Sequence, residues 1–255
     1  MEFSLWIFLS LCMITLVESI LLVDLNSAVI DGWSLSSCDQ SIKSIKAKVP
    51  GNVHTDLLNS ILYGNDPYYR FNELNMSWIP LKCWKYELVN FNIPLYDSQY
   101  LLFKEIDTVS KIYVNGFFIG STKNAHRSHL LRLNTSVIRP NNNTLQVIVE
   151  SPLKYSKKQS ESYPYEIPAT ENYNVGAEPS HRSFIRKAGS DMGWDWGPAF
   201  ATSGISGDVF LVYAPDGYLD GISVVQQFDN SNFSSAVTLH AVSYTHLTLP
   251  TIYSV

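Results

Sequence analysis

The chain has 255 residues, 45% of them hydrophobic and 16% charged, and a formal net charge of −5. This apolar content is enough for one sizeable core and the start of a second domain. No run of Lys or Arg is long enough for a nucleic-acid interface or a patch that binds anionic membranes, so these classes are excluded. The 15 Tyr and 6 Trp suit surfaces that are part apolar and part wet, as in carbohydrate or protein interfaces.

Residues 1–19 predict a signal peptide. Their apolar stretch, Phe3–Val17, is shorter than the about 20 residues of a membrane span, and small residues permit cleavage before Ile20. The alternative is an uncleaved anchor, because apolar residues continue to Val23. We therefore expect a lysosomal or secreted protein without a stable membrane span. Four sequons agree with this route and predict glycosylation; they begin at Asn75, Asn134, Asn142 and Asn232.

Two cysteines remain once Cys12 leaves with the signal peptide, namely Cys38 and Cys83. In an oxidising compartment the two could form a disulfide. Two free buried thiols fit the sequence equally well, because sequence alone does not bring the two Cα atoms within reach of each other.

The mature chain predicts short strands separated by turn residues. Residues 42–49 partly alternate apolar and polar side chains and end at Pro50-Gly51. One helical face then predicts a single short helix ending near Gly64; its members are Val53, Leu57, Leu58 and Ile61. Further strands are expected at residues 84–93, 101–103, 145–150 and 209–213.

The clearest local signal is Asn115-Gly116, which lies between two β-prone arms and predicts a hairpin, since both turn positions need positive φ. Many short strands with turns between them indicate an all-β antiparallel sandwich. No glycine-rich phosphate loop follows a strand, so a nucleotide-binding α/β fold is excluded.

Residues 151–193 are polar and weakly periodic, and such long irregular stretches inside a domain are usually functional or disordered. A domain boundary is expected at residues 215–217. New strands are then expected at residues 222–226 and 236–241, in a unit too short to close a second sandwich.

The chemistry-bearing motif is Gly193-Trp194-Asp195-Trp196-Gly197-Pro198. An indole face packs against the C–H face of a pyranose, and a carboxylate accepts charge-assisted hydrogen bonds from hydroxyls. Residue types alone favour a plainer interpretation, in which the two Trp anchor a loop and Asp195 caps a turn.

From about residue 32 to 213 the chain resembles the amino-terminal sugar-binding domain of the β-mannosidases in glycoside hydrolase family 2. The resemblance rests on the order and spacing of several runs. These are residues 50–57, 68–75, 107–116, 119–120, 184–187, 193–198 and 204–205. The chain departs from the family at Ser206-Gly207, where a bulky residue is usual, and the last residues, 242–255, resemble nothing in the family and are expected to be a non-native tail.

The resemblance implies a galactose-binding-like jelly-roll β-sandwich over residues 20–215 and the start of an immunoglobulin-like domain at 216–241. It implies that Trp194, Asp195 and Trp196 bind the mannose of a β-mannoside oligosaccharide. The family hydrolyses terminal non-reducing β-mannosides with retention, using two glutamates on a barrel.

Neither glutamate is expected here, because such a barrel needs roughly 250 residues, and the Asn72-Glu73 pair lies within the sandwich's own matching run. We expect no catalytic residue, cofactor or metal, and an inactive chain. The alternative function is a stand-alone carbohydrate-binding module.

Two histidines three positions apart, His126 and His129, are expected to be solvated loop residues that do not bind a metal. His54 near Asp56 lacks the serine pattern of a triad.

Overall fold

The computed structural model describes residues 21–26, 32–96, 98–165, 167, 174–194, 197–214, 218–229, 234–244 and 251–254. These residues are mostly in strands, with a few short helices. The chain divides into two compact units. One unit comprises Val23–Leu95 and Tyr100–Leu211, and the other comprises the remaining residues; each is described by itself.

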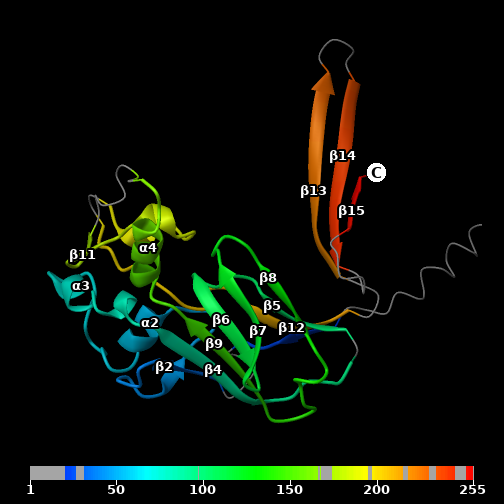
Figure 1. Cartoon of the computed structure of the whole chain (residues 1–255). Helices are drawn as coiled ribbons and strands as arrows, with labels where there is room; N and C mark the ends of the chain where they lie inside the picture. The colour runs from blue at the N-terminus through cyan, green and yellow to red at the C-terminus, as the bar shows by residue number, and fades with distance from the viewer. Residues whose placement is uncertain are drawn as a thin grey trace, which may run out of the picture. The chain divides into compact units, whose positions relative to one another are not determined.

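The larger sheet of the first unit has six antiparallel strands in the order β3-β2-β4-β9-β6-β7 (Figure 1). Its strands are β2 (Trp33–Ser37), β3 (Ile45–Ala47), β4 (Trp84–Phe91), β6 (Val109–Val114), β7 (Phe117–Lys123) and β9 (Asn143–Val149). Along β9 every second side chain is buried. This period of two places one face of the strand on the core.

A second sheet has four strands in the order β1-β12-β5-β8. Its strands are β1 (Leu21–Asp24), β5 (Gln99–Phe103), β8 (His129–Leu133) and β12 (Val209–Tyr213). Side chains from both sheets belong to one apolar cluster, among them Leu88 and Leu145 from the first sheet and Phe103 from the second. The all-β sandwich predicted from the sequence is therefore confirmed.

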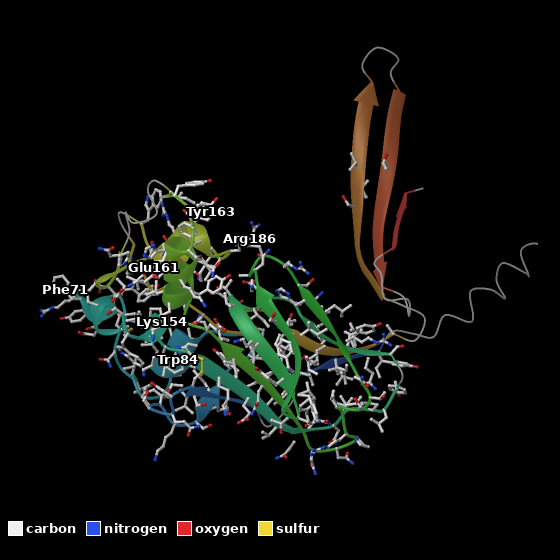
Figure 2. The ribbon with its side chains drawn as sticks, viewed as in Figure 1. Phe71, Trp84, Lys154, Glu161, Tyr163 and Arg186 are labelled. Carbon is white, nitrogen blue, oxygen red and sulfur yellow. A yellow bond between two sulfur atoms is a disulfide. The ribbon has the colours of Figure 1, made fainter. Side chains whose placement is uncertain are left out.

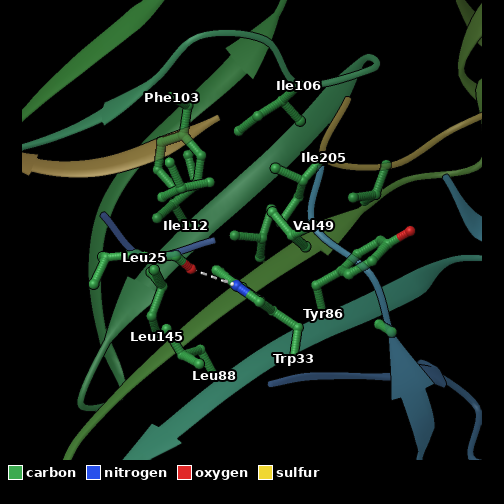
Figure 3. Packing of buried hydrophobic residues seen from close by; sticks show 14 of the residues in the cluster. Leu25, Trp33, Val49, Tyr86, Leu88, Phe103, Ile106, Ile112, Leu145 and Ile205 are labelled. Atoms are coloured by element: carbon green, nitrogen blue, oxygen red, sulfur yellow. Dashed lines mark hydrogen bonds between the residues drawn. The ribbon is translucent and has the colours of Figure 1, made fainter. Parts of the chain in front are cut away.

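The sandwich core is close-packed hydrocarbon with few polar groups (Figure 3). Trp33 is 1% exposed, and its indole Nε1 donates a hydrogen bond to the Leu25 carbonyl oxygen at 2.8 Å. Each fully buried Leu or Phe side chain stabilises the fold by about 1.5–3 kcal/mol. The core residues thus supply most of the stability of this unit.

The predicted hairpin forms between β6 and β7. Its two turn residues, Asn115 and Gly116, have φ of 51° and 83°. The Asn115 amide nitrogen Nδ2 also donates to the Val137 carbonyl at 2.7 Å, so this residue joins the turn to a neighbouring loop.

The helices are more numerous than the single one expected. They are α2 (Val53–Leu58), α3 (Asn72–Asn75) and α4 (Pro152–Glu161), with 3-10 turns η1 (Ile79–Leu81), η2 (Arg182–Phe184) and η3 (Gly189–Met192). Helix α2 begins as predicted, behind an Asn52 cap, but ends at Leu58, well before Gly64. The pair Asn72-Glu73 lies in α3 rather than in a loop.

Helix α4 lies in the stretch that we expected to be irregular. The Ser151 hydroxyl accepts a hydrogen bond from the Lys154 backbone N–H, and Pro152 occupies the first helical position. This Ser-Pro pair is a recognised helix start. The expectation was wrong because the helix is strongly polar, so its periodicity is weak. Two short strands follow it, β10 (Asn174–Val175) and β11 (Glu178–Pro179).

A disulfide joins Cys38 and Cys83, whose Cα atoms lie 5.4 Å apart. It links the chain just after β2 to the residue just before β4, and the Cys38 N–H donates to the Cys83 carbonyl at 2.9 Å. Of the two alternatives that the sequence left open, the structure has the disulfide.

The second unit contains three antiparallel strands, β13 (Tyr218–Asp229), β14 (Ser234–Tyr244) and β15 (Thr251–Ser254). The strands expected at residues 222–226 and 236–241 lie within β13 and β14. Strand β14 continues past residue 242, where we expected the tail to begin. Residues 1–19 and 215–217 lie outside the described residues, and the expected domain limits stay predictions.

Candidate functional site

Trp194 and Gly197 of the motif form an isolated antiparallel bridge, which closes one end of a short stem. The Trp194 N–H donates to the Gly197 carbonyl at 3.3 Å, and the Gly197 N–H donates to the Trp194 carbonyl at 3.2 Å. Lower down, the Ala201 N–H donates to the Asp191 carbonyl at 2.7 Å. The backbone therefore leaves at Asp191, reverses between Trp194 and Gly197, and returns at Ala201.

Gly193 occupies a position of the stem that only glycine fits without strain. Its φ is 83°, and a Cβ there would lie 2.9 Å from the Ala199 Cβ. A side chain would therefore strain the backbone and collide with the opposite arm of the stem.

Trp194 is the predicted site residue that the structure describes. It is 47% exposed, and the Arg182 guanidinium carbon lies 5.8 Å from its ring centroid. This cation–π distance lets Arg182, in η2, orient the indole. Asp195 and Trp196 lie outside the described residues.

A small pocket of about 220 Å³ lies against the turn. Trp194 and Pro198 line one part of it, and Glu73 and Leu74 of α3 line another. Beside α3, the aromatic side chain of Phe71 is 72% exposed (Figure 2). The pocket combines a carboxylate, an indole and apolar groups, a mixture that suits a sugar ring.

A largely buried group of charged side chains includes Asp191, at the base of the stem. The Lys187 Nζ forms ion pairs with the Asp107 Oδ2 at 3.2 Å and with the Asp191 carboxylate, and the exposed fraction of the Lys187 side chain is 1%. The Thr202 hydroxyl oxygen lies 2.9 Å from Asp191 Oδ2 and 3.2 Å from Asp107 Oδ2, and its single proton is shared between these two acceptors. We call Asp107, Lys187, Asp191 and Thr202 the Lys187 cluster. Burial raises the pKa of Asp107, although Lys187 opposes that shift.

Three of the sequence runs that carry the family resemblance, 50–57, 107–116 and 204–205, meet just after the returning arm of the stem. Gly51 donates to the Ile205 carbonyl at 2.8 Å, and Val53 donates to the Ser203 carbonyl at 2.9 Å. Asp107 and Gly204 exchange backbone hydrogen bonds of 2.9 and 2.7 Å. Runs far apart in the sequence thus assemble one region, and their separate roles were not predictable from the sequence.

Two aromatic side chains flank Phe200, on the returning arm of the stem. Its ring centroid lies 5.7 Å from that of His54 and 5.8 Å from that of Tyr68, both edge-on. His54 is buried, and neither of its ring nitrogens has a hydrogen-bond partner among the residues that the structure describes. Burial, followed by repulsion from Lys187, lowers its pKa to about 4, so the imidazole is neutral near pH 7 and adds no charge to the Lys187 cluster.

Asp56 does not pair with His54. Its carboxylate accepts hydrogen bonds from the Lys48 backbone N–H at 2.9 Å and from the Tyr86 hydroxyl at 3.4 Å. Burial raises the pKa of Asp56 to about 6. These partners are structural, and they connect α2 to β4.

Three of the four sequon asparagines are described, and all three are exposed: Asn75, Asn134 and Asn142. Asn232 lies outside the described residues. Exposure meets one requirement for glycosylation, which stays a prediction.

The expectation for His129 was wrong. This side chain is buried in β8, with Nε2 3.0 Å from the Asn124 carbonyl oxygen, whereas His126 is exposed.

Comparison with known families gives a match to the domain described as "Glycosyl hydrolase 2 galactose-binding domain-like", over residues 33–207. Among curated proteins, the beta-mannosidase of Rattus norvegicus is 33% identical over 218 residues, which are 82% of this chain and 24% of that protein. The beta-mannosidase of Mus musculus is 34% identical over 78% of this chain and 23% of its own length. The chain spans about a quarter of the length of these relatives.

Among solved structures, the beta-D-mannosidase of Dictyoglomus thermophilum matches with a TM-score of 0.72 and 28% identity, over 93% of this chain and 29% of that chain. The exo-chitosanase CsxA of Amycolatopsis orientalis matches with a TM-score of 0.57 and 19% identity, over 92% of this chain and 27% of that chain. The second likeness shows the fold alone.

Proposed function

The chain belongs to the glycosyl hydrolase 2 family through its galactose-binding-like domain, and from this membership we propose that it is the amino-terminal part of a β-mannosidase. The protein would remove terminal non-reducing β-D-mannose from glycans. The relatives that support this activity are named beta-mannosidases. The substrate partner is accordingly a β-mannoside oligosaccharide.

The observation that carries the proposal is the Trp194–Gly197 turn. It places a half-exposed indole beside a pocket and has Asp195 and Trp196 between its two bridging residues. Asp195 would accept hydrogen bonds from ring hydroxyls, which are strong when the acceptor is charged. Trp194 and Trp196 would cover the C–H faces of the sugar.

Hydrolysis itself requires two carboxylates across the scissile bond. We propose that these belong to a barrel that residues 1–255 do not contain, because 48 residues follow the matched domain, whereas a barrel needs roughly 250. The 255-residue chain would then supply substrate contacts and no turnover.

We also propose passage through the secretory pathway. The Cys38–Cys83 disulfide is typical of oxidising compartments, and the described sequon asparagines are exposed. In the described part of the chain, no helix is long and apolar enough to cross a bilayer. Lysosomal delivery and secretion both agree with these features.

Asp195→Ala, made in the extended protein that sequencing of the full transcript would define, tests the role of the turn. Loss of charge-assisted contacts to the sugar should lower kcat/KM for an aryl β-mannoside about 100-fold, or ~3 kcal/mol, while the melting temperature stays close to that of wild type. Asp39→Ala is the control, because it removes an exposed carboxylate paired with Lys82. Normal kinetics with a lowered melting temperature would refute the binding role.

The purified 255-residue chain tests the placement of the catalytic residues. We expect no release of aglycone from an aryl β-mannoside above the rate in buffer. Turnover that persists through purification and is lost in Glu73→Gln would show that the chain holds its own catalytic carboxylate. A transcript with a native stop shortly after the sandwich would instead favour a stand-alone carbohydrate-binding module.

A further inference from the structure

The Lys187 cluster connects the stem to the rest of the fold through charged side chains that are largely removed from water. The exposed fractions of its three charged side chains are 1% for Lys187, 10% for Asp107 and 24% for Asp191. Removing charges from water costs several kcal/mol per ion, and their attraction roughly offsets that cost. Apolar side chains in place of all three charged groups would therefore serve stability about as well.

A buried ammonium constrains the orientation of the groups that bind it, whereas an apolar side chain does not. The three N–H donors of the ammonium must meet acceptors at defined angles, whereas apolar contacts are non-directional. Here the acceptors come from separate segments: Asp107 precedes β6, and Asp191 lies in η3. The Thr202 hydroxyl ties the returning arm of the stem to the same two carboxylates.

Asp191 is also the residue at which the stem closes. Its side chain pairs with Lys187, and its backbone carbonyl accepts the hydrogen bond from Ala201. Only Met192 and Gly193 separate it from Trp194. A shift of the Asp191 carboxylate therefore moves both arms of the stem, and the turn with them.

We propose that Lys187 and Asp191 are positioning residues for sugar binding: through Asp107 they fasten the Trp194–Gly197 turn to the β-sandwich in one orientation. The inference rests on the proposed function and deepens it, because it assigns a role to two runs, 107–116 and 184–187, that touch no sugar. Misplacement of a binding group by about 1 Å can cost 100-fold in rate, so a directional anchor has a functional use.

The surroundings of the cluster favour this role. Within two residues of its members along the chain stand Val109, Ile185 and Met192, which belong to one small cluster of buried apolar side chains. The buried His54 imidazole interacts electrostatically with both Lys187 and Asp191. Being neutral near pH 7, it leaves Lys187 as the cation that satisfies both carboxylates in this buried group.

The first test measures the stem in the 255-residue chain by amide hydrogen exchange. Asp191→Asn keeps the Lys187–Asp107 pair and removes the charge that ties the stem to it. We expect the amides of Ala201 and Gly193 to exchange at least tenfold faster, while the β4–β9 ladder keeps its rates. Asp39→Asn breaks the exposed pair with Lys82 and should change none of these amides.

Lys187→Met is the stronger variant and should loosen the stem further, but it leaves two buried carboxylates unpaired and risks unfolding. Asp191→Asn therefore decides the question. If this variant folds and its Ala201 and Gly193 amides exchange at the wild-type rate, the anchor does not position the turn, and the inference is refuted.

The second test measures hydrolysis of an aryl β-mannoside by the extended protein. Asp191→Asn should lower kcat about tenfold, with a smaller change in KM, because misalignment is felt most in the transition state. A loosened stem with unchanged kcat refutes the positioning role, provided that Asp195→Ala impairs hydrolysis. If Asp195→Ala also leaves hydrolysis unchanged, the proposed function fails, and the inference with it.

Discussion

The core of the sandwich and the Lys187 cluster are both largely removed from water, but the core consists of apolar side chains and the cluster of charged ones. In the sandwich, side chains such as Phe103, Ile112 and Leu145 from the two sheets meet as hydrocarbon (Figure 3). At the base of the stem, the Lys187 ammonium instead forms ion pairs with the Asp107 and Asp191 carboxylates.

The difference separates stability from placement. Apolar burial is non-directional and supplies most of the folding free energy. A buried ion group contributes little net stability but holds its members at defined angles. The sandwich should therefore set whether the chain folds, and the Lys187 cluster should set where the turn points. The following changes test that division.

Leu88→Ala should have the largest effect on stability. Leu88 is fully buried in β4, and truncation removes transfer free energy and leaves a cavity, at about 2–5 kcal/mol. Denaturant unfolding would measure the loss. The matched control is Val89→Ala on the same strand, which is 45% exposed and should cost under about 1 kcal/mol. Equal losses for the two variants would contradict the assignment of the core.

Removal of the disulfide should come next. Replacing Cys38 and Cys83 together by Ser should lower the free energy of unfolding by about 2–4 kcal/mol, because the bond restricts the unfolded chain. Unfolding of the double variant, compared with wild type in the presence and absence of reductant, would measure it. A wild-type protein that shows two free thiols by mass spectrometry would contradict the pairing.

The sequence predicted the sandwich because its signals are local and repeated. Alternating burial of side chains is typical of a strand such as β9. The pair Asn115-Gly116 predicts the β6–β7 hairpin, because both turn positions require positive φ and few residue pairs meet that requirement. Helix α4 was missed, although Ser151-Pro152 carries a capping signal, because a polar helix has weak periodicity.

The site was predictable only in part, and for a physical reason. The motif containing Trp194 stands out by composition and by resemblance. Its support does not, because Asp107, Lys187 and Asp191 are single charged residues that meet only in three dimensions. A lone lysine in sequence predicts a solvated side chain, and no local pattern distinguishes the buried Lys187 from the exposed Lys154.

Gly193→Ala should have a smaller but local effect. At φ of 83° a Cβ strains the backbone, and it would meet the Ala199 Cβ at 2.9 Å, at a cost of about 1–3 kcal/mol. Thermal unfolding would measure the cost. Gly189→Ala is the control, since a Cβ there meets nothing within 4 Å. If both variants melt alike, the stem does not require glycine at position 193.

The smallest expected effect is a hidden pH dependence of stability within α2, where His54 and Asp56 titrate in opposite senses. His54 has a folded pKa of about 4 against the ordinary histidine value of 6.5, so the unfolded chain binds its proton first and stability falls as the pH drops through this range. Asp56 has a folded pKa of about 6 against 3.8, so the folded chain holds the extra proton and stability falls as the pH rises from about 4 to 6.

In wild type the two contributions offset each other between about pH 4 and 6, and single variants should expose them. Relative to wild type, His54→Phe should lower the melting temperature more at pH 6 than at pH 4.5, because only the Asp56 dependence remains. Asp56→Asn should do the reverse. Differences of a few degrees are expected for a domain of this size, and thermal unfolding at the two pH values measures them. Deviations of the same sign in both variants would mean that these groups do not titrate as their burial requires.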